Sequence, residues 1–237
     1  MKIQDSVVFV TGGSRGIGRA LVTEVLARGA AKVYATARDP KTIISDPRVV
    51  PVRLEVTDPA SVAAATADAT DVNLLVNNAG VTLNADLLNG DLAEVRREIE
   101  INFYGPLQVT RALAPRLIAN RGHLLNIHSV LSWYAALGAY APSKAAMWAM
   151  TNVLRQELHP QGVGVTGLHV GWVDTDMADQ WAPADVPRSN PADVARLAID
   201  GVEAGQHEVL ADDFSRTVKS ALAQDIAVLY PQLAGDA

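Results

Sequence analysis

Residues 11–18 read Thr11-Gly12-Gly13-Ser14-Arg15-Gly16-Ile17-Gly18 and join a short apolar run to a segment with helical spacing. The run before them, residues 7–10, is β-branched and aromatic, as expected of a strand buried on both faces. Glycine allows a sharp turn and lets a phosphate approach the backbone, while the start of a helix offers free N–H groups. The stretch therefore predicts a phosphate-binding strand–turn–helix unit, with an ordinary strand–helix turn as the alternative.

Strand-like and helix-like segments alternate along the rest of the chain. Short β-branched runs between turn residues predict strands at residues 7–10, 32–36, 49–56, 73–76, 123–128, 164–170 and 208–211. Apolar residues three or four apart predict helices at residues 17–28, 91–119, 141–158 and 193–203, with Pro106 near the middle of the second.

This alternation predicts an α/β protein. We expect a single-domain Rossmann fold over residues 1–237, with a doubly wound, mostly parallel seven-stranded sheet flanked by helices on both faces. The one long irregular segment, about residues 176–191, is predicted to be a substrate loop over the site.

Composition excludes several function classes. The 237 residues carry a net charge of −6 and no block of Lys or Arg that would indicate a nucleic-acid surface. The chain has no cysteine, which excludes disulfides and cysteine-based nucleophiles or metal sites. The first residues show no signal peptide, and no apolar run approaches the ~18 residues that span a bilayer. We expect a cytoplasmic protein without a metal, membrane or nucleic-acid partner.

Two further motifs have fixed places in this pattern. The tetrapeptide at residues 77–80, Asn-Asn-Ala-Gly, directly follows the fourth predicted strand, and Tyr140 and Lys144 form a Y-x-x-x-K motif after the fifth. With the T-G-x-x-x-G-x-G spacing of residues 11–18, they resemble the classical short-chain dehydrogenase/reductase (SDR) family over about residues 5–180. The resemblance implies a nicotinamide cofactor bound by Gly12, Ser14, Arg15, Gly16, Ile17, Gly18, Arg38, Glu55, Val56, Asn78, Ala79, Gly80, Tyr140, Lys144, Val173 and Thr175.

The end of the second predicted strand indicates which cofactor is bound. NAD-binding Rossmann proteins usually place an acid here, on the ribose 2′-hydroxyl, whereas this chain has Ala37 and then Arg38. A guanidinium binds a 2′-phosphate bidentately, and the family's geometry implies that Arg15 forms the other side of that pocket. We therefore expect NADP(H). The alternative is a surface Arg38 paired with Asp39.

Tyr140 and Lys144 are the candidate acid/base pair. They are four residues apart, about one helical turn, so both side chains lie on one helix face. The unperturbed pKa of tyrosine, about 10, is too high for easy proton exchange at neutral pH, and a nearby ammonium lowers it. The pair is therefore predicted to act as a general acid/base.

Two more residues complete the constellation that the resemblance implies. Ser129, at the end of the fifth predicted strand, would polarise the substrate oxygen, and Asn102 would hold a water that links Lys144 to solvent. Only eleven residues separate Ser129 from Tyr140, which is shorter than usual in the family and indicates a shortened loop. The alternatives are Ser132 in place of Ser129, and a structural Asn102 that caps a kink before Pro106.

The aromatic residues near the predicted site indicate its substrate. Trp133, Tyr134, Trp172 and Trp181 fall in segments around the site and predict an apolar or bulky carbonyl substrate, with ordinary core packing as the alternative. Trp148 is expected at a subunit interface. The resemblance implies a homodimer or homotetramer formed through the two long helices.

Four further features bear on the site. His128 and His169 lie in predicted buried strands, and we interpret them as core histidines with satisfied hydrogen bonds. Val170 stands where the family usually has proline, which predicts a looser turn before Val173. Residues 212–214, Asp-Asp-Phe, replace the glycine-rich ending of the family's acyl-carrier ketoreductases and argue against fatty-acid synthesis.

The sequence therefore predicts an NADP-preferring oxidoreductase of the carbonyl reductase type. It would reduce a ketone or aldehyde to an alcohol by reversible hydride transfer from NADPH. Two alternatives are an NAD-linked alcohol dehydrogenase of the same family and a non-catalytic NADP-binding sensor.

Overall fold

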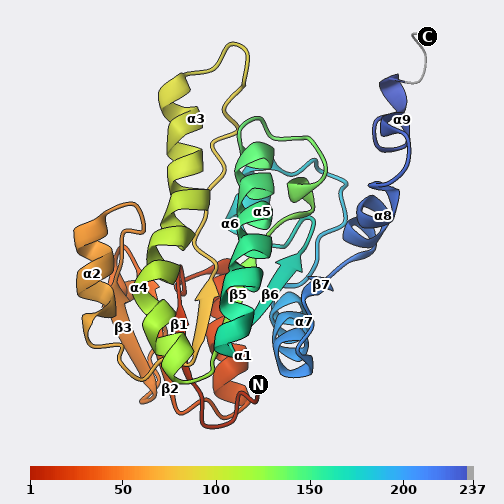
Figure 1. The fold of residues 1–237 in the computed structure, drawn as a ribbon. Coiled ribbons are helices and arrows are strands. Elements are labelled where there is room, and N and C mark those ends of the chain that lie inside the picture. Colours follow the sequence, from red (N-terminus) through yellow and green to blue (C-terminus); the bar gives the residue numbers. More distant parts are fainter. Residues whose placement is uncertain (234–237) are drawn as a thin grey trace.

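The computed structural model describes residues 1–233. Seven strands in this part of the chain form one sheet of order β3-β2-β1-β4-β5-β6-β7, and every neighbouring pair is parallel (Figure 1). The strands are β1 (Val7–Val10), β2 (Lys32–Ala37), β3 (Val49–Arg53), β4 (Leu74–Asn77), β5 (His123–Ile127), β6 (Gly164–His169) and β7 (Glu208–Leu210). The predicted single-domain Rossmann fold is confirmed.

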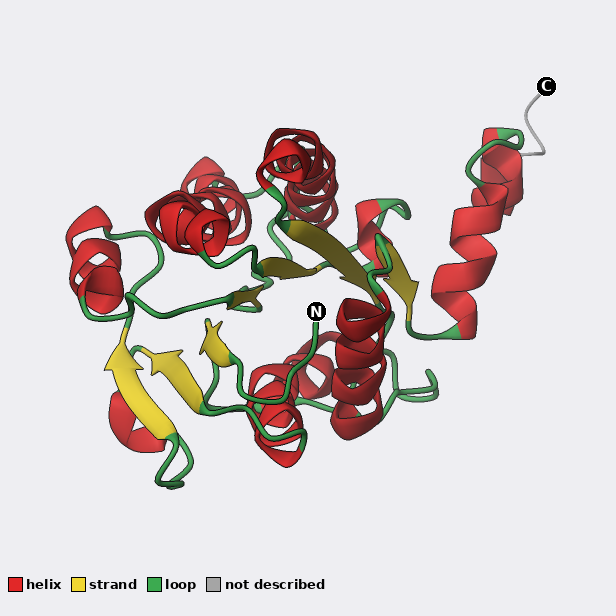
Figure 2. Cartoon of the chain, turned by 60° about the horizontal axis from the view of Figure 1, so that its bottom comes forward, coloured by secondary structure: helices red, strands yellow, loops and turns green. Residues whose placement is uncertain are grey.

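Helices cover both faces of the sheet (Figure 2). They are α1 (Gly16–Ala27), α2 (Pro59–Ala67), α3 (Leu92–Ile99), α4 (Gly105–Ala119), α5 (Tyr140–Leu158), α6 (Asp176–Trp181), α7 (Pro191–Ala204), α8 (Asp213–Ala221) and α9 (Ile226–Leu229). Short helical turns are η1 (Pro40–Thr42), η2 (Glu100–Tyr104), η3 (Val130–Ser132), η4 (His159–Gln161) and η5 (Pro231–Leu233).

The two apolar cores follow from the alternation of side chains along each strand. Val8 and Val10 belong to the cluster on the α1 and α7 face, whereas Phe9 between them belongs to the cluster on the α2, α4 and α5 face. Val8, Phe9 and Val10 are all fully buried. Strands covered on both faces explain why the first apolar run is continuous instead of alternating.

The sheet reverses its direction of growth at β1. This strand pairs with β2 on one side and β4 on the other, so the loops that leave the carboxyl ends of β1 and β4 run apart. In open parallel sheets, ligands bind at such a switch point. Both predicted motifs of the first half of the chain, residues 11–18 and 77–80, begin at this point.

The helix predicted at residues 91–119 is not one regular helix. The α-helices α3 and α4 are joined by η2, a π-helical turn at residues 100–104 that ends where Gly105 and Pro106 start α4. Pro106 therefore comes directly after the π-helical turn, among the first residues of α4 in an unbroken run of helical residues. The turn places Asn102, which is fully buried, beside the carboxyl end of the sheet.

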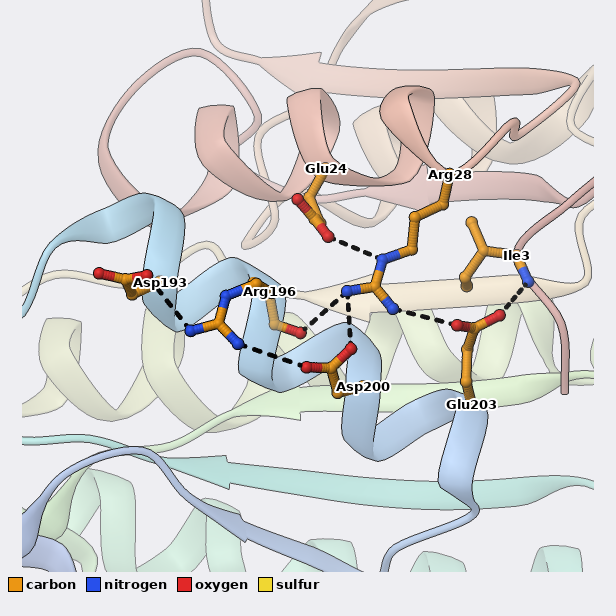
Figure 3. A network of polar contacts seen from close by, with 7 residues as sticks. All are labelled: Ile3, Glu24, Arg28, Asp193, Arg196, Asp200 and Glu203. Atoms are coloured by element: carbon orange, nitrogen blue, oxygen red, sulfur yellow. Dashed lines mark hydrogen bonds and ion pairs between the residues drawn. The ribbon is translucent and has the colours of Figure 1, made fainter.

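An ion-pair network joins the helices on the α1 and α7 face (Figure 3). Arg28, at the end of α1, pairs with Glu24 at 2.7 Å, with Asp200 at 2.8 Å and with Glu203 at 3.0 Å. Glu203 also accepts the backbone N–H of Ile3 at 3.1 Å. The network ties the start of the chain and α1 to α7, far from the carboxyl ends of the strands.

The last part of the chain differs from the sequence prediction in two ways. The segment at about residues 176–191 contains the short helix α6, and an isolated bridge pairs Val173 with Ser189. After β7 the chain forms α8 and α9, which the sequence analysis did not predict and which lie beyond the β7 edge of the sheet (Figure 1).

The third strand ends earlier than predicted. It ends at Arg53, so Glu55 and Val56 lie in the loop that follows it.

Candidate active site

One cleft of about 1880 Å³ opens at the carboxyl ends of the strands. Every residue predicted to bind the cofactor lines it, and so does Ser129. We call the cleft-lining residues of segments 12–18, 36–38, 54–57 and 78–80 the cofactor side, and those of segments 81–83, 129–144, 171–189 and 212–214 the substrate side. Asn102 does not line the cleft, because it is buried behind residues 80 and 81.

The glycine-rich turn has the geometry of an anion cradle. Gly12 and Gly16 have φ angles of 66° and 52°, which other residues rarely adopt. A Cβ at Gly18 would overlap the carbonyl oxygen of Gly12. Helix α1 begins at Gly16 with no side-chain cap and no acid in its first turn, so its first N–H groups are available to a ligand. The turn therefore fits a pyrophosphate group.

Side-chain hydrogen bonds lock this turn to the loop after β4. The buried hydroxyl of Thr11 accepts the backbone N–H groups of Asn78 at 2.9 Å and Ala79 at 3.0 Å. The Asn78 amide donates to the carbonyl oxygens of Thr11 at 2.9 Å and Gly12 at 3.1 Å. Next to it, the Asn77 amide donates to Asn126 at 2.9 Å and so joins β4 to β5.

The two arginines predicted for the 2′-phosphate are placed differently. Arg38 is exposed at the edge of the cleft and forms no ion pair within residues 1–233, while Asp39 accepts the N–H of Lys41. The alternative pairing of Arg38 with Asp39 is therefore wrong. Arg15 pairs instead with Asp176 of α6 at 2.8 Å, and both side chains are 72% exposed. This pair was not predicted, and it occupies one nitrogen of the guanidinium that was expected to face the cofactor.

Tyr140 and Lys144 lie on one face of the first turn of α5, as predicted. The Lys144 ammonium donates to the carbonyl oxygen of Ile127 at 3.0 Å and lies 5.7 Å from the centre of the Tyr140 ring. Burial raises the pKa of Tyr140 above its ordinary value; the Ser129 hydroxyl lowers it, and the charge of Glu98 raises it further. The predicted lowering of this pKa by Lys144 is therefore wrong for the structure described.

Lys144 is itself shifted toward neutral pH. Its side chain is buried, and desolvation lowers the pKa of Lys144 from 10.5 to about 8. A group with this pKa exchanges protons readily near physiological pH, which suits it to replenish a proton at a neighbouring phenol.

Ser129 lies where the sequence predicted it, at the start of η3 directly after β5. Its hydroxyl accepts the N–H of Leu131 at 3.1 Å and lines the cleft. Ser132, the alternative, is buried and does not line the cleft. The amide of Asn102 bonds Val81 through both of its ends, at 2.9 and 2.8 Å, and donates to Ser143 at 2.9 Å. Asn102 thus fixes the loop after β4 instead of capping a kink in its own helix.

Glu98 is a candidate residue that the sequence analysis missed. It is fully buried on α3, one turn before Asn102, and accepts the N–H of Leu83 at 2.9 Å. Burial raises the pKa of Glu98, which the polar groups of residues 82–85 oppose. The only sign of it in the sequence was its spacing, four residues before Asn102. The other charged residues of this helix are exposed.

Behind Ser129 lies a buried aromatic stack, in which His128 and His169 are core residues as predicted and His169 Nδ1 lies 3.3 Å from the carbonyl oxygen of Ser129. The His169 ring stacks on His128 at 4.8 Å and on Trp133 at 3.8 Å between ring centres. Neither ring nitrogen of His128 has a hydrogen-bond partner within the described residues, so the hydrogen bonds that were predicted for this histidine are not found. Burial lowers the pKa of His169 to about 4, and that of His128 as well, so both rings are neutral at physiological pH. Trp133 is buried in this stack and does not line the cleft, contrary to prediction.

The other tryptophans fall in two groups. Trp172 and Trp181 line the substrate side, as predicted, together with Tyr134. Trp148, expected at a subunit interface, donates to Glu208 at 3.0 Å and packs edge-on against Trp133 within its own chain. In the turn before Val173, the N–H of Gly171 donates to Asp212 at 2.5 Å.

Two kinds of site are not seen within residues 1–233. No group of three or more His, Cys, Asp or Glu side chains there could hold a metal ion. No helix in the same range is long and apolar enough to cross a membrane.

Comparison with known proteins agrees with this geometry. The short chain dehydrogenase family matches residues 6–185. An uncharacterized oxidoreductase of Staphylococcus saprophyticus is 30% identical over 227 residues, which cover 87% of this chain and 95% of that protein. An NADPH-dependent 1-acyldihydroxyacetone phosphate reductase of Schizosaccharomyces pombe is 34% identical and is matched over 72% of this chain and 61% of its own length.

A solved structure matches over the whole length. A short chain dehydrogenase from Burkholderia cenocepacia, crystallised in complex with NADP, is 34% identical, has a TM-score of 0.93 and is covered completely, as is this chain. The motifs, the parallel sheet and these matches have one explanation: the chain belongs to the short chain dehydrogenase family of oxidoreductases.

Proposed function

We propose that the protein reduces a ketone or aldehyde to an alcohol with NADPH, in a reversible reaction. The observation that carries this proposal is the joint presence, on one cleft, of the glycine cradle, of Arg38 without an acid before it, and of Ser129, Tyr140 and Lys144. Bound NADPH supplies the hydride that the carbonyl carbon accepts.

The protein residues handle the proton and the charge. The Tyr140 hydroxyl gives its proton to the carbonyl oxygen as the carbon accepts the hydride, and the raised pKa of Tyr140 keeps that hydroxyl protonated at neutral pH. The Ser129 hydroxyl hydrogen-bonds the same oxygen and favours the developing negative charge. Lys144, with a pKa of about 8, returns a proton to Tyr140, and Asn102 holds the loop that forms one wall of this relay.

Preference for NADPH over NADH rests on the end of β2. Ala37 leaves no carboxylate to repel a 2′-phosphate, and Arg38 lies at the cleft edge with no ion pair among residues 1–233. Arg15 pairs with Asp176 through one nitrogen, which leaves its other N–H groups as donors on the cofactor side. The NADP bound to the Burkholderia relative and the NADPH named for the Schizosaccharomyces enzyme support this choice.

The two alternatives have less support. An NAD-linked alcohol dehydrogenase would be expected to have an acid where Ala37 stands. A non-catalytic sensor has no use for a buried Lys144 and a cleft-lining Ser129 beside Tyr140. The cytoplasmic location and the homodimer or homotetramer through the two long helices stay predictions.

The test is consumption of NADPH and, separately, of NADH with aliphatic ketones, aryl ketones, aldehydes and diketones. We expect turnover with a clear preference for NADPH. Tight NADPH binding without turnover of any substrate in the panel would contradict the proposed reaction, and equal use of NADH would contradict the role of Arg38.

A further inference from the structure

The chain after β7 lies outside the region that the family match covers, residues 6–185, yet it reaches the cleft. Asp212, Asp213 and Phe214 line the substrate side. Three sets of contacts hold this segment, and each one ends on a part of the chain that carries a site residue.

The first set begins at Asp212, which caps the start of α8. One carboxylate oxygen accepts the N–H of Ser215 at 2.7 Å, and the other accepts the N–H of Gly171 at 2.5 Å. Gly171 starts the turn that contains Val173 and Thr175. The start of α8 and this turn are therefore fixed to each other by a single carboxylate.

The second set anchors the middle of α8. Lys219 donates to Glu208 at 2.7 Å, and its ammonium lies 4.4 Å from the centre of the Trp133 ring. Val218 is buried in the apolar cluster that contains Trp133 and Leu131. Trp133 belongs to the shortened segment between Ser129 and Tyr140, so α8 supports the segment that links the two site residues.

The third set is an aromatic corner made by Tyr134, Phe214 and Tyr230. The Tyr134 ring packs edge-to-face on Phe214 at 5.6 Å and stacks on Tyr230 at 5.2 Å. The Tyr230 hydroxyl accepts the N–H of Ala135 at 2.7 Å. Tyr134 and Phe214 line the cleft, and Phe214 remains 44% exposed, so its ring is available to a ligand.

The charges at this corner are acidic or already paired. Asp212 and Asp213 lie on either side of the start of α8, and Arg216 is held by Asp213 at 2.7 Å. Arg188 pairs with Asp179 at 2.6 Å and with Asp174 at 3.6 Å. An anionic substrate group would meet carboxylates here, whereas a neutral ring would meet two aromatic faces.

We propose that α8 forms the outer wall of the substrate side, and that Phe214 with Tyr134 selects a carbonyl substrate that presents an uncharged aromatic ring to this corner. This inference rests on the proposed carbonyl reduction and specifies its substrate class. Phe214 is a specificity-determining residue in it, and Asp212 and Lys219 position the helix that carries Phe214.

The test compares Phe214→Ala, Phe214→Leu and the control Leu222→Ala, which removes a 40% exposed side chain just after α8 that does not line the cleft. We expect Phe214→Ala to lower kcat/KM for acetophenone by about tenfold, mainly through KM, and to leave that for 2-butanone within about twofold. Phe214→Leu keeps much of the bulk without the ring and is expected to lose most of the same preference. Leu222→Ala should match the wild type.

A second measurement does not depend on turnover. Calorimetry of 1-phenylethanol binding to the enzyme saturated with NADP⁺ should show about tenfold weaker binding in Phe214→Ala than in the wild type. If Phe214→Ala weakens binding of the alcohol in this way but the wild type turns over no carbonyl, the proposed reaction is contradicted. The proposed role of Phe214 in the substrate side is then still supported. Equal losses for acetophenone and 2-butanone, or no loss for either, would overturn the inference.

Discussion

The cofactor side and the substrate side of the cleft differ in the chemical groups that form them. On the cofactor side, glycines, backbone N–H groups and the small side chains of Thr11 and Asn78 set the geometry. On the substrate side, large side chains from distant segments meet, as where Ala135 is bonded by Tyr230, 95 residues later. A backbone-built site leaves a short motif in the sequence, whereas a site built from side-chain contacts between distant segments leaves none.

The same difference predicts how each side responds to substitution. Damage on the cofactor side should affect both folding and cofactor binding, because the turn and the sheet share their hydrogen bonds. Damage on the substrate side should affect turnover or selectivity while the cofactor still binds.

The largest difference between turnover and cofactor binding is expected from Tyr140→Phe. Without the hydroxyl, kcat for carbonyl reduction should fall by about 10²–10⁴-fold, because no positioned acid protonates the oxygen. The dissociation constant for NADPH, measured by its fluorescence, should stay within about twofold of the wild type, since the cradle is untouched. Tyr104→Phe, at a 45% exposed tyrosine, is the control. A Tyr140→Phe enzyme with the wild-type rate would refute the assignment.

On the cofactor side, Arg38→Ala should change the choice of nicotinamide. Loss of charge-assisted hydrogen bonds worth about 1.5–3 kcal/mol should lower kcat/KM for NADPH by roughly 10–100-fold and leave that for NADH nearly unchanged. Arg53→Ala, at another exposed arginine close by in the sequence, is the matched control. An equal loss with both cofactors would show that Arg38 contacts a part that they share.

Thr11→Val tests whether the cofactor side carries folding stability. Valine has the same shape but leaves the N–H groups of Asn78 and Ala79 without their acceptor. The free energy of unfolding in urea should fall by about 2 kcal/mol, and NADPH binding should weaken. Thr23→Val, at an exposed helix position, should change neither. A stable Thr11→Val protein with weak NADPH binding would mean that the turn and the sheet are independent.

The smallest effect is expected from Glu98→Gln on the substrate side. The charge of Glu98 raises the pKa of Tyr140, because a negative neighbour disfavours a phenolate. Alcohol oxidation needs that phenolate as a base, so its rate rises with pH through the Tyr140 pKa. Removing the charge should lower the pKa of Tyr140 and so raise kcat/KM for the alcohol at a given pH below that pKa, measured with NADP⁺ against pH.

The control for this shift is Glu157→Gln on α5, which removes an exposed charge that does not line the cleft and that water screens. Equal profiles for the wild type and Glu98→Gln would show that Glu98 is protonated in the working range or too weakly coupled to Tyr140.

The sequence predicted the parallel sheet and which residues line the cofactor side, for a physical reason. Alternating strands and helices and the glycines of residues 12–18 are local patterns, and a parallel sheet then dictates where the loops meet. The pairing of Arg15 with Asp176, the burial of Glu98 and the role of Phe214 depend on which distant segments come together. No spacing in the chain encodes these contacts. The Tyr140 pKa was predicted in the wrong direction because burial, which a sequence does not display, raises it.

The π-helical turn at residues 100–104 joins α3 to α4 and sets the rotation of one helix relative to the other. The two helices direct their buried side chains toward different parts of the molecule. Val109 and Leu113 of α4 face the sheet, while Glu98 of α3 faces the loop at residues 82–85. Each residue of an α-helix advances the rotation by roughly 100°, so deletion of one residue within the turn would swing Glu98 away from that loop while α4 stayed seated. The register of the active-site wall is thus held by a single extra residue, and an insertion or deletion there would be far more damaging than a substitution at an exposed position of the same turn, such as Tyr104.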